Sequence, residues 1–139
     1  MKISARNQLS GIVEYLEEGT VNTSVYIKLQ SGYTLVSVIT NTAVEDLNLQ
    51  LGDEVLAFFK SSSALITTDV TLNISARNKF QGKIEEIKEG RVTAEIDIAI
   101  GNTDKIASVI TKVSTNSLGL KIGDNVSAII KASDIMIAK

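Results

Sequence analysis

The sequence has no cysteine, histidine, proline or tryptophan. Without cysteine and histidine, neither disulfide bonds nor a zinc site of the usual ligands can stabilise a small domain. Without proline, no strand is forced to the edge of a sheet. No apolar run approaches a membrane span, and the first residues lack the charged and apolar regions of a secretory signal. We therefore expect a cytoplasmic protein with no membrane partner.

Aromatic residues are also scarce, and positive charge is not in excess. Aromatic side chains make up 4% of the chain, and the formal net charge is −2. A general nucleic-acid binder normally presents a basic face, and a single-strand binder also needs aromatic rings on which bases stack. The composition therefore disfavours a nucleic-acid partner.

What the sequence does contain is an internal repeat of one unit. Ser4-Ala5-Arg6-Asn7 returns as Ser75-Ala76-Arg77-Asn78, and later landmarks return at the same offset of 71 residues without a gap. A period this long predicts two tandem domains, which we place at 1–68 and 74–139. The junction 69–73 lacks glycine and proline, and we expect it to continue a strand as a stiff connection. A lone unit of this size buries only about 60% of its unfolded surface, so we expect units to pack together within and between chains.

Each copy is predicted to be rich in β-structure. In one segment of each copy, apolar residues fall at every second position or multiples of it, at Val21, Val25, Ile27 and Leu29 and at Val92, Ile96, Ile98 and Ile100. Such spacing is typical of a strand with one buried face. Further strands are predicted over 34–40, 54–60, 105–111 and 125–131.

Turns and one short helix complete each predicted unit. Gly19 and Gly90 precede the alternating segments, where we expect turns with positive φ. One helix is expected from Thr42, as its N-cap, to Leu47, with acidic residues in its first turn. The fold class predicted is all-β: two tandem OB-like small β-barrels, each with one short helix.

Most repeated residues have a structural explanation. The apolar pairs are expected in the core: Val21/Val92, Ile27/Ile98, Leu47/Leu118, Val55/Val126 and Ala57/Ala128. The repeated carboxylates Glu14/Glu85 and Asp53/Asp124 fall on a solvated strand and at a turn, where they favour solubility and turn formation over acid–base catalysis. With no histidine, no cysteine and no nucleotide-binding glycine motif, the sequence does not indicate an enzyme.

Six polar pairs are harder to explain as architecture: Ser4/Ser75, Arg6/Arg77, Asn7/Asn78, Thr40/Thr111, Lys60/Lys131 and Ser62/Ser133. Arginine supplies a planar fork of donors, lysine a point charge, and serine and threonine neutral donors. This set suits a hard, multiply charged oxyanion held by charge-assisted hydrogen bonds.

With Ser-Ala-Arg-Asn at the head of both copies, Gly-Asp before a late strand, and Lys-Ser or Lys-Ala after it, the whole chain resembles the molbindins. These Mop domains belong to the wider TOBE class of OB-like modules. The resemblance implies a cytoplasmic protein that binds molybdate, and usually tungstate, for storage or homeostasis. It also implies a homotrimer of two-domain chains with oxyanions between units, no cofactor, and metal bound only as oxyanion.

The resemblance also implies the binding residues. The first half-site comprises Ser4, Ala5 through its backbone, Arg6, Lys60 and Ser61, and the second comprises Ser75, Ala76, Arg77, Lys131 and Ala132. A neighbouring unit would add Thr40 with Ala43, or Thr111 with Ser114. If unlike units meet, Ser61 and Ser114 complete one pocket, whereas Ala132 and Ala43 leave the other without two hydroxyls. We therefore hypothesise two classes of site, the complete one binding more tightly.

Some alternatives stay open. The family also has oxyanions near its threefold axis, and Thr20, Asn22 and Thr93 cannot be assigned to such a site. An OB-like module that binds single-stranded nucleic acid, or a regulatory assembly module that only senses an anion, would each fit the predicted fold. Molybdate and tungstate are not distinguished by these residues.

Overall fold

The computed structural model describes residues 2–139, which form two five-stranded antiparallel sheets. The first copy contains β1 (Asn7–Glu18), β2 (Asn22–Leu29), β3 (Thr34–Thr40), α1 (Asn41–Asp46), β4 (Glu54–Phe59), the 3-10 turn η1 (Ser61–Ser63) and β5 (Leu65–Thr67). The second contains β6 (Asn78–Glu89), β7 (Thr93–Ile100), β8 (Asp104–Thr111), α2 (Lys112–Ser117), β9 (Asn125–Ile130), η2 (Ala132–Asp134) and β10 (Met136–Ala138). The two helices have six residues each, far fewer than a membrane-spanning helix requires.

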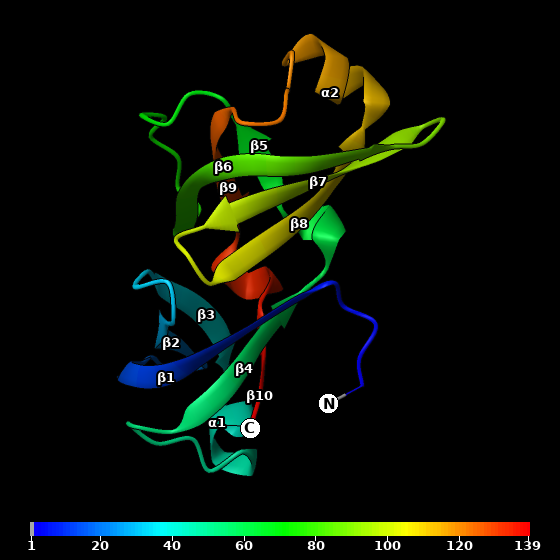
Figure 1. Ribbon diagram of the computed structural model, residues 1–139. Coiled ribbons are helices and arrows are strands. Elements are labelled where there is room, and N and C mark those ends of the chain that lie inside the picture. Colours follow the sequence, from blue (N-terminus) through cyan, green and yellow to red (C-terminus); the bar gives the residue numbers. More distant parts are fainter. Residues whose placement is uncertain (1) are drawn as a thin grey trace.

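The two sheets exchange their last strands. One sheet has the order β10-β4-β1-β2-β3 and the other β5-β9-β6-β7-β8. Figure 1 shows β10 descending from the second copy to lie beside β4, while β5 lies in the other sheet. Met136 pairs with Phe58 and Leu65 with Ile129. Each copy therefore completes its sheet with a strand from the other, and the chain is two interlocked units.

The buried faces follow the predicted alternation inside the strands. Val25, Ile27 and Leu29 of β2 are buried, as are Ile96, Ile98 and Ile100 of β7, and Val55, Val126, Ala57 and Ala128 confirm the expected core. Three of the predicted core residues are exposed. Val21 and Val92 are 67% and 74% exposed because they stand in the turns before β2 and β7 begin, and Leu118, at the end of α2, is 39% exposed.

The helix of the first copy is correctly predicted, but the predicted N-cap residue, Thr42, is wrong. The N-cap is Thr40, whose hydroxyl accepts a hydrogen bond from the Ala43 N–H at 3.1 Å. The helix thus begins two residues before its expected start, so Glu45 and Asp46 lie in its second half and its first turn contains no acid. Thr111 caps α2 in the same way, accepting from the Ser114 N–H at 3.0 Å.

Gly19 and Gly90 form turns as predicted, but neither has positive φ. The Gly19 N–H donates to the Asn22 carbonyl at 2.8 Å, and the Gly90 N–H donates to the Thr93 carbonyl at 2.8 Å. A Cβ at Gly19 would stand 2.9 Å from the Asn22 carbonyl oxygen. These glycines are therefore required by close backbone approach and not by a left-handed conformation.

The junction does not continue a strand, contrary to the prediction. Asp69 instead forms a local turn: its carboxylate accepts from the Thr71 N–H at 3.0 Å and the Thr71 hydroxyl at 2.7 Å. The Leu72 N–H donates to the Asp69 carbonyl at 3.2 Å. Aspartate offers the backbone such side-chain partners, and this turn separates β5 from β6.

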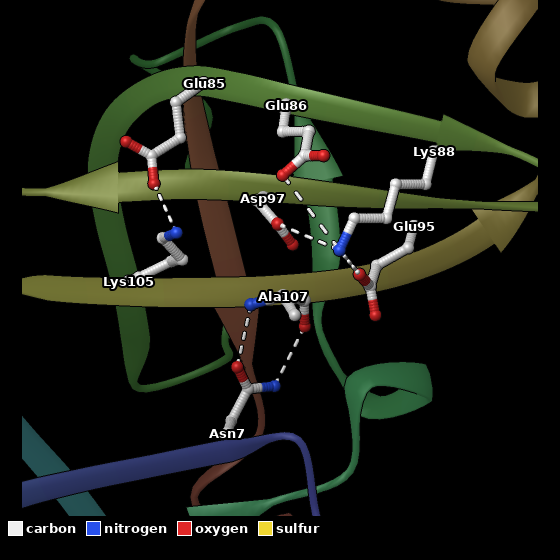
Figure 2. A network of polar contacts seen from close by, with 8 residues as sticks. All are labelled: Asn7, Glu85, Glu86, Lys88, Glu95, Asp97, Lys105 and Ala107. Atoms are coloured by element: carbon white, nitrogen blue, oxygen red, sulfur yellow. Dashed lines mark hydrogen bonds and ion pairs between the residues drawn. The ribbon is translucent and has the colours of Figure 1, made fainter.

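Two repeated polar pairs join the copies across their contact. The Asn7 side chain donates to the Ala107 carbonyl at 2.8 Å and accepts from the Ala107 N–H at 2.7 Å (Figure 2). Asn78 makes the same two bonds with Val36, both at 2.8 Å. The buried hydroxyls of Ser37 and Ser108 donate to the Ile135 and Ala64 carbonyls. The repetition of Asn7 and Asn78 is thus explained by architecture.

Candidate functional site

The first cleft is formed where one strand starts and its neighbour ends. β1 and β4 are antiparallel with Asn7 opposite Phe59. The residues before β1 and those after β4 therefore fall side by side, which brings Ser4, Ala5 and Arg6 to Lys60 and Ser61. They line a cleft of about 340 Å³ with Ile3, Phe58, Ser62 and Met136.

The second cleft repeats this construction. Asn78 lies opposite Ile130 in the β6–β9 ladder, so Ser75, Ala76 and Arg77 meet Lys131 and Ala132. The cleft measures about 610 Å³. It also takes Val38, Ser62, Ser63 and Leu65 from the first copy. Met136 and Leu65 reach the opposite copy's cleft through the exchanged strands, so each cleft contains residues of both copies.

The positive charges of the clefts lack ion-pair partners within the described part of the chain. The ion pairs there involve Lys88, Lys105 and Lys139. Arg6, Lys60, Arg77 and Lys131 are all exposed. Asp134 also lines the second cleft. Unneutralised guanidinium and ammonium groups beside serine hydroxyls can bind an anion through charge-assisted hydrogen bonds.

The predicted neighbour elements lie elsewhere in the chain. Thr40 and Ala43, and Thr111 and Ser114, are at the beginnings of α1 and α2 and line neither cleft within residues 2–139. The hydroxyls of Thr111 and Ser114 are hydrogen-bonded at 2.8 Å. Capping a helix is sufficient reason for repeating Thr40 and Thr111.

Sequence reasoning missed the apolar border of the clefts. Ile3 and Met136 border the first cleft, and Ile74 and Leu65 border the second. All four are exposed. Their signal was available in the repeat, because Ile3/Ile74 and Leu65/Met136 are each separated by 71 residues and each pair stays apolar.

A third hollow, of about 630 Å³, lies near Gly11, Lys28, Glu54 and Lys139. It is larger than the first cleft, but its charge is less suited to an anion. Lys139 pairs with Asp53 at 3.0 Å, and Glu54 adds a carboxylate. Hollow size alone therefore does not indicate the functional site.

The repeated acids behave as turn and surface residues. Asp53 accepts from the Gln50 N–H at 2.7 Å, and Asp124 accepts from the Lys121 N–H at 2.9 Å. The Gln50 hydrogen bond, aided by Lys139, lowers the pKa of Asp53. Glu14 accepts from the Thr34 hydroxyl, and Glu85 pairs with Lys105. Within residues 2–139, His, Cys, Asp and Glu form no cluster suited to a metal ion.

The fold and the paired clefts define a tandem β-barrel module, and comparison with known proteins gives its family. The TOBE domain model matches residues 3–66 and 74–137, so the chain belongs to the TOBE domain family. The fold resembles that of a crystal structure of the cytoplasmic molybdate-binding protein ModG with molybdate bound. The TM-score is 0.95 and the identity 41%, covering 99% of both chains.

Relatives in the family have molybdenum in their names. The chain is 39% identical over 138 residues to the molybdenum transport protein ModE of Azotobacter vinelandii, covering 99% of this chain and 51% of that protein. It is 34% identical over 139 residues to the molybdenum-pterin-binding protein MopA of Rhodobacter capsulatus, covering 99% and 52%. The chain thus spans about half the length of these two relatives.

A shorter relative corresponds to one copy. Molybdenum-pterin-binding protein 3 of Clostridium pasteurianum is 44% identical over 66 residues, covering 48% of this chain and 97% of its own. These relatives confirm the resemblance to the Mop proteins and the prediction of two tandem OB-like domains.

Proposed function

We propose that this chain binds molybdate, and tungstate as a close analogue, in the two clefts. The observation that carries the proposal is the repeated meeting of a Ser-Ala-Arg segment with a Lys-Ser or Lys-Ala segment at 71-residue spacing. ModG, which is named for binding molybdate, and MopA, which is named for molybdenum, support the choice of anion.

The proposed mechanism is reversible capture without covalent change. A tetrahedral dianion exchanges water for arginine, lysine, hydroxyl and backbone N–H donors. The donors include no base of the kind a hydrolase uses, and no cofactor is needed. The chain therefore acts as a binding protein and not as an enzyme.

Exposed apolar residues support self-association. Val21/Val92 and Leu51/Ile122 repeat at the 71-residue offset, and all four are at least 62% exposed. Burial of these side chains against another chain would remove their apolar surface from water, which favours association. We propose a homotrimer in which a neighbouring chain closes each cleft. The closing residues would be Thr40 of its first copy, or Thr111 and Ser114 of its second copy.

The cellular role proposed is molybdate storage or homeostasis in the cytoplasm, the compartment named for ModG. Nucleic-acid binding is less well supported. Phe58, Phe59 and Phe80 are buried, and Tyr15, which is 51% exposed, packs against the Tyr26 ring, so few rings are available for bases to stack on.

Titration calorimetry with molybdate, tungstate and sulfate tests the proposal. Replacing both Arg6 and Arg77 by alanine should abolish molybdate binding, whereas Arg91→Ala, an exposed arginine outside both clefts, should leave it unchanged. Undiminished molybdate affinity in the double variant would falsify the site assignment. Sedimentation of the intact chain tests the trimer, which a purely monomeric mass would contradict.

A further inference from the structure

Arg77 of the second cleft is held by the first copy. Its guanidinium Nη2 donates to the Tyr26 hydroxyl at 3.1 Å, and its Cζ lies 5.7 Å from the centre of the Tyr26 ring. The Tyr26 ring packs in turn against Tyr15, with centroids 5.3 Å apart. Tyr26 belongs to β2, so a strand of one copy supports the arginine of the other copy's cleft.

The first cleft has no such support. The residue 71 positions after Tyr26 is Asp97, which is 6% exposed and lies 3.9 Å from Lys88 Nζ (Figure 2). Within residues 2–139, the Arg6 side chain makes no hydrogen bond or ion pair. The two copies thus keep the same arginine but differ in what holds it.

We propose that Tyr26 is a positioning residue for anion binding in the second cleft, acting through Arg77. This inference rests on the proposed function, because it assumes that Arg77 contacts the oxyanion. Tyr26 has no equivalent for Arg6, so the two clefts differ in preorganisation as well as in the Ser61/Ala132 difference.

The physical reason is that Tyr26 holds the arginine without neutralising it. An exposed arginine loses considerable rotamer freedom when a ligand fixes it. A tyrosine ring and hydroxyl restrict the guanidinium before the anion arrives, and they carry no charge that would compete with the anion. A carboxylate at the same place would form an ion pair with Arg77 and oppose anion binding.

The test separates the clefts with arginine variants and measures molybdate affinity by calorimetry. In an Arg6→Ala background only the second cleft retains its arginine, and Tyr26→Leu should weaken binding there by roughly three- to tenfold. Tyr26→Phe, which keeps the ring, should recover part of that loss. Tyr26→Asp should weaken binding more than Tyr26→Leu. In an Arg77→Ala background, Tyr26→Leu should change nothing.

Tyr33→Phe is the matched control, because the Tyr33 hydroxyl donates to the Gln81 carbonyl at 3.0 Å and lines neither cleft. The molybdate affinity of the Tyr33→Phe variant should equal that of the parent. Equal losses from Tyr26→Leu in both backgrounds, or no loss in either, would overturn the inference while leaving the proposed function intact. Failure of the unsubstituted chain to bind molybdate would overturn both.

Discussion

The side chains of Asn7 and Asn78 join the two copies by hydrogen bonding to the backbone of a strand in the opposite copy. Each side-chain amide satisfies both the N–H and the C=O of one residue, Ala107 or Val36. Both asparagines are 1% exposed. Buried backbone groups that lose their partners are costly, so these amides are specific determinants of how the copies pack.

Asn78→Ala should therefore destabilise the protein. It leaves the Val36 N–H and C=O without partners, which should lower the free energy of unfolding by about 2–4 kcal/mol. Urea denaturation followed by circular dichroism measures the change. Asn102→Ala, at an exposed turn position, is the control and should leave the midpoint unchanged. Equal midpoints for the two variants would contradict the structural role of Asn78.

Asp97 is a buried acid whose pKa is raised, chiefly by desolvation and also by Glu95, against the opposing effects of Lys88 and Lys105. Because its folded pKa lies above the unfolded value of 3.8, stability falls as pH rises from 3.8 through the folded pKa. Asp97→Asn removes this penalty.

The melting temperature of Asp97→Asn should accordingly exceed that of the parent at neutral pH, and the difference should disappear below pH 3.8. Thermal unfolding across this pH range measures it. Glu89→Gln, which changes an exposed acid on the neighbouring strand β6, is the control. A lower melting temperature of the Asn variant at neutral pH would show that the Lys88 pair outweighs the desolvation.

At the scale of elements, the exchange of β5 and β10 makes each copy depend on the other. β4 pairs with β10 and β9 with β5, each over three residues. The turns η1 and η2, which precede these strands, also contain Ser61 and Ala132 of the clefts. The same short segment therefore shapes a cleft and crosses to the other copy.

Residues 1–68 expressed alone should consequently assemble in pairs. An isolated first copy has no β9 for its β5 and no β10 for its β4. In a pair of fragments, however, the β5 of each fragment can lie beside the β4 of the other. Analytical ultracentrifugation should show an even-numbered assembly whose unfolding midpoint rises with concentration. A monomer with a cooperative, concentration-independent transition would contradict this. The one-copy relative from Clostridium pasteurianum makes the fragment a reasonable unit to study.

For the whole molecule, the proposed trimer would complete the clefts. If unlike copies meet in the proposed trimer, Ser61 of the first cleft would face Thr111 and Ser114 of a neighbouring chain. Ser61→Ala or Ser114→Ala should each weaken the tighter class of molybdate sites by about 1.5–3 kcal/mol, the cost of one hydrogen bond to a charged ligand.

Calorimetry on both variants tests the pairing, with Ser10→Ala as the control, because Ser10 is exposed and lines neither cleft. A single uniform class of sites, unchanged in affinity across the two variants, would remove the idea that unlike copies meet. Loss confined to Ser61→Ala would instead indicate that Thr111 and Ser114 act only as helix caps.

The sequence by itself determined the all-β fold and the strand of 34–40, whose bounds are those of β3, while the resemblance to the molbindins grouped Arg6 with Lys60 and Arg77 with Lys131. The fold class and this strand follow from the alternation of apolar residues, which local residue patterns specify. The two-residue alternation could not show that Val21 and Val92 lie before their strands, because alternation does not mark where a strand begins.

Only the tertiary structure decided which copy each last strand joins. Leu65–Thr67 and Met136–Ala138 occupy equivalent positions in their copies. A strand can pair with its own sheet or with the duplicate through nearly the same contacts, so local sequence does not distinguish the two arrangements. The side-chain amides of Asn7 and Asn78 bind the opposite copy and hold the two copies together in the exchanged arrangement. The contact between Tyr26 and Arg77 likewise joins residues 51 positions apart, and only the packing of the two copies brings them together.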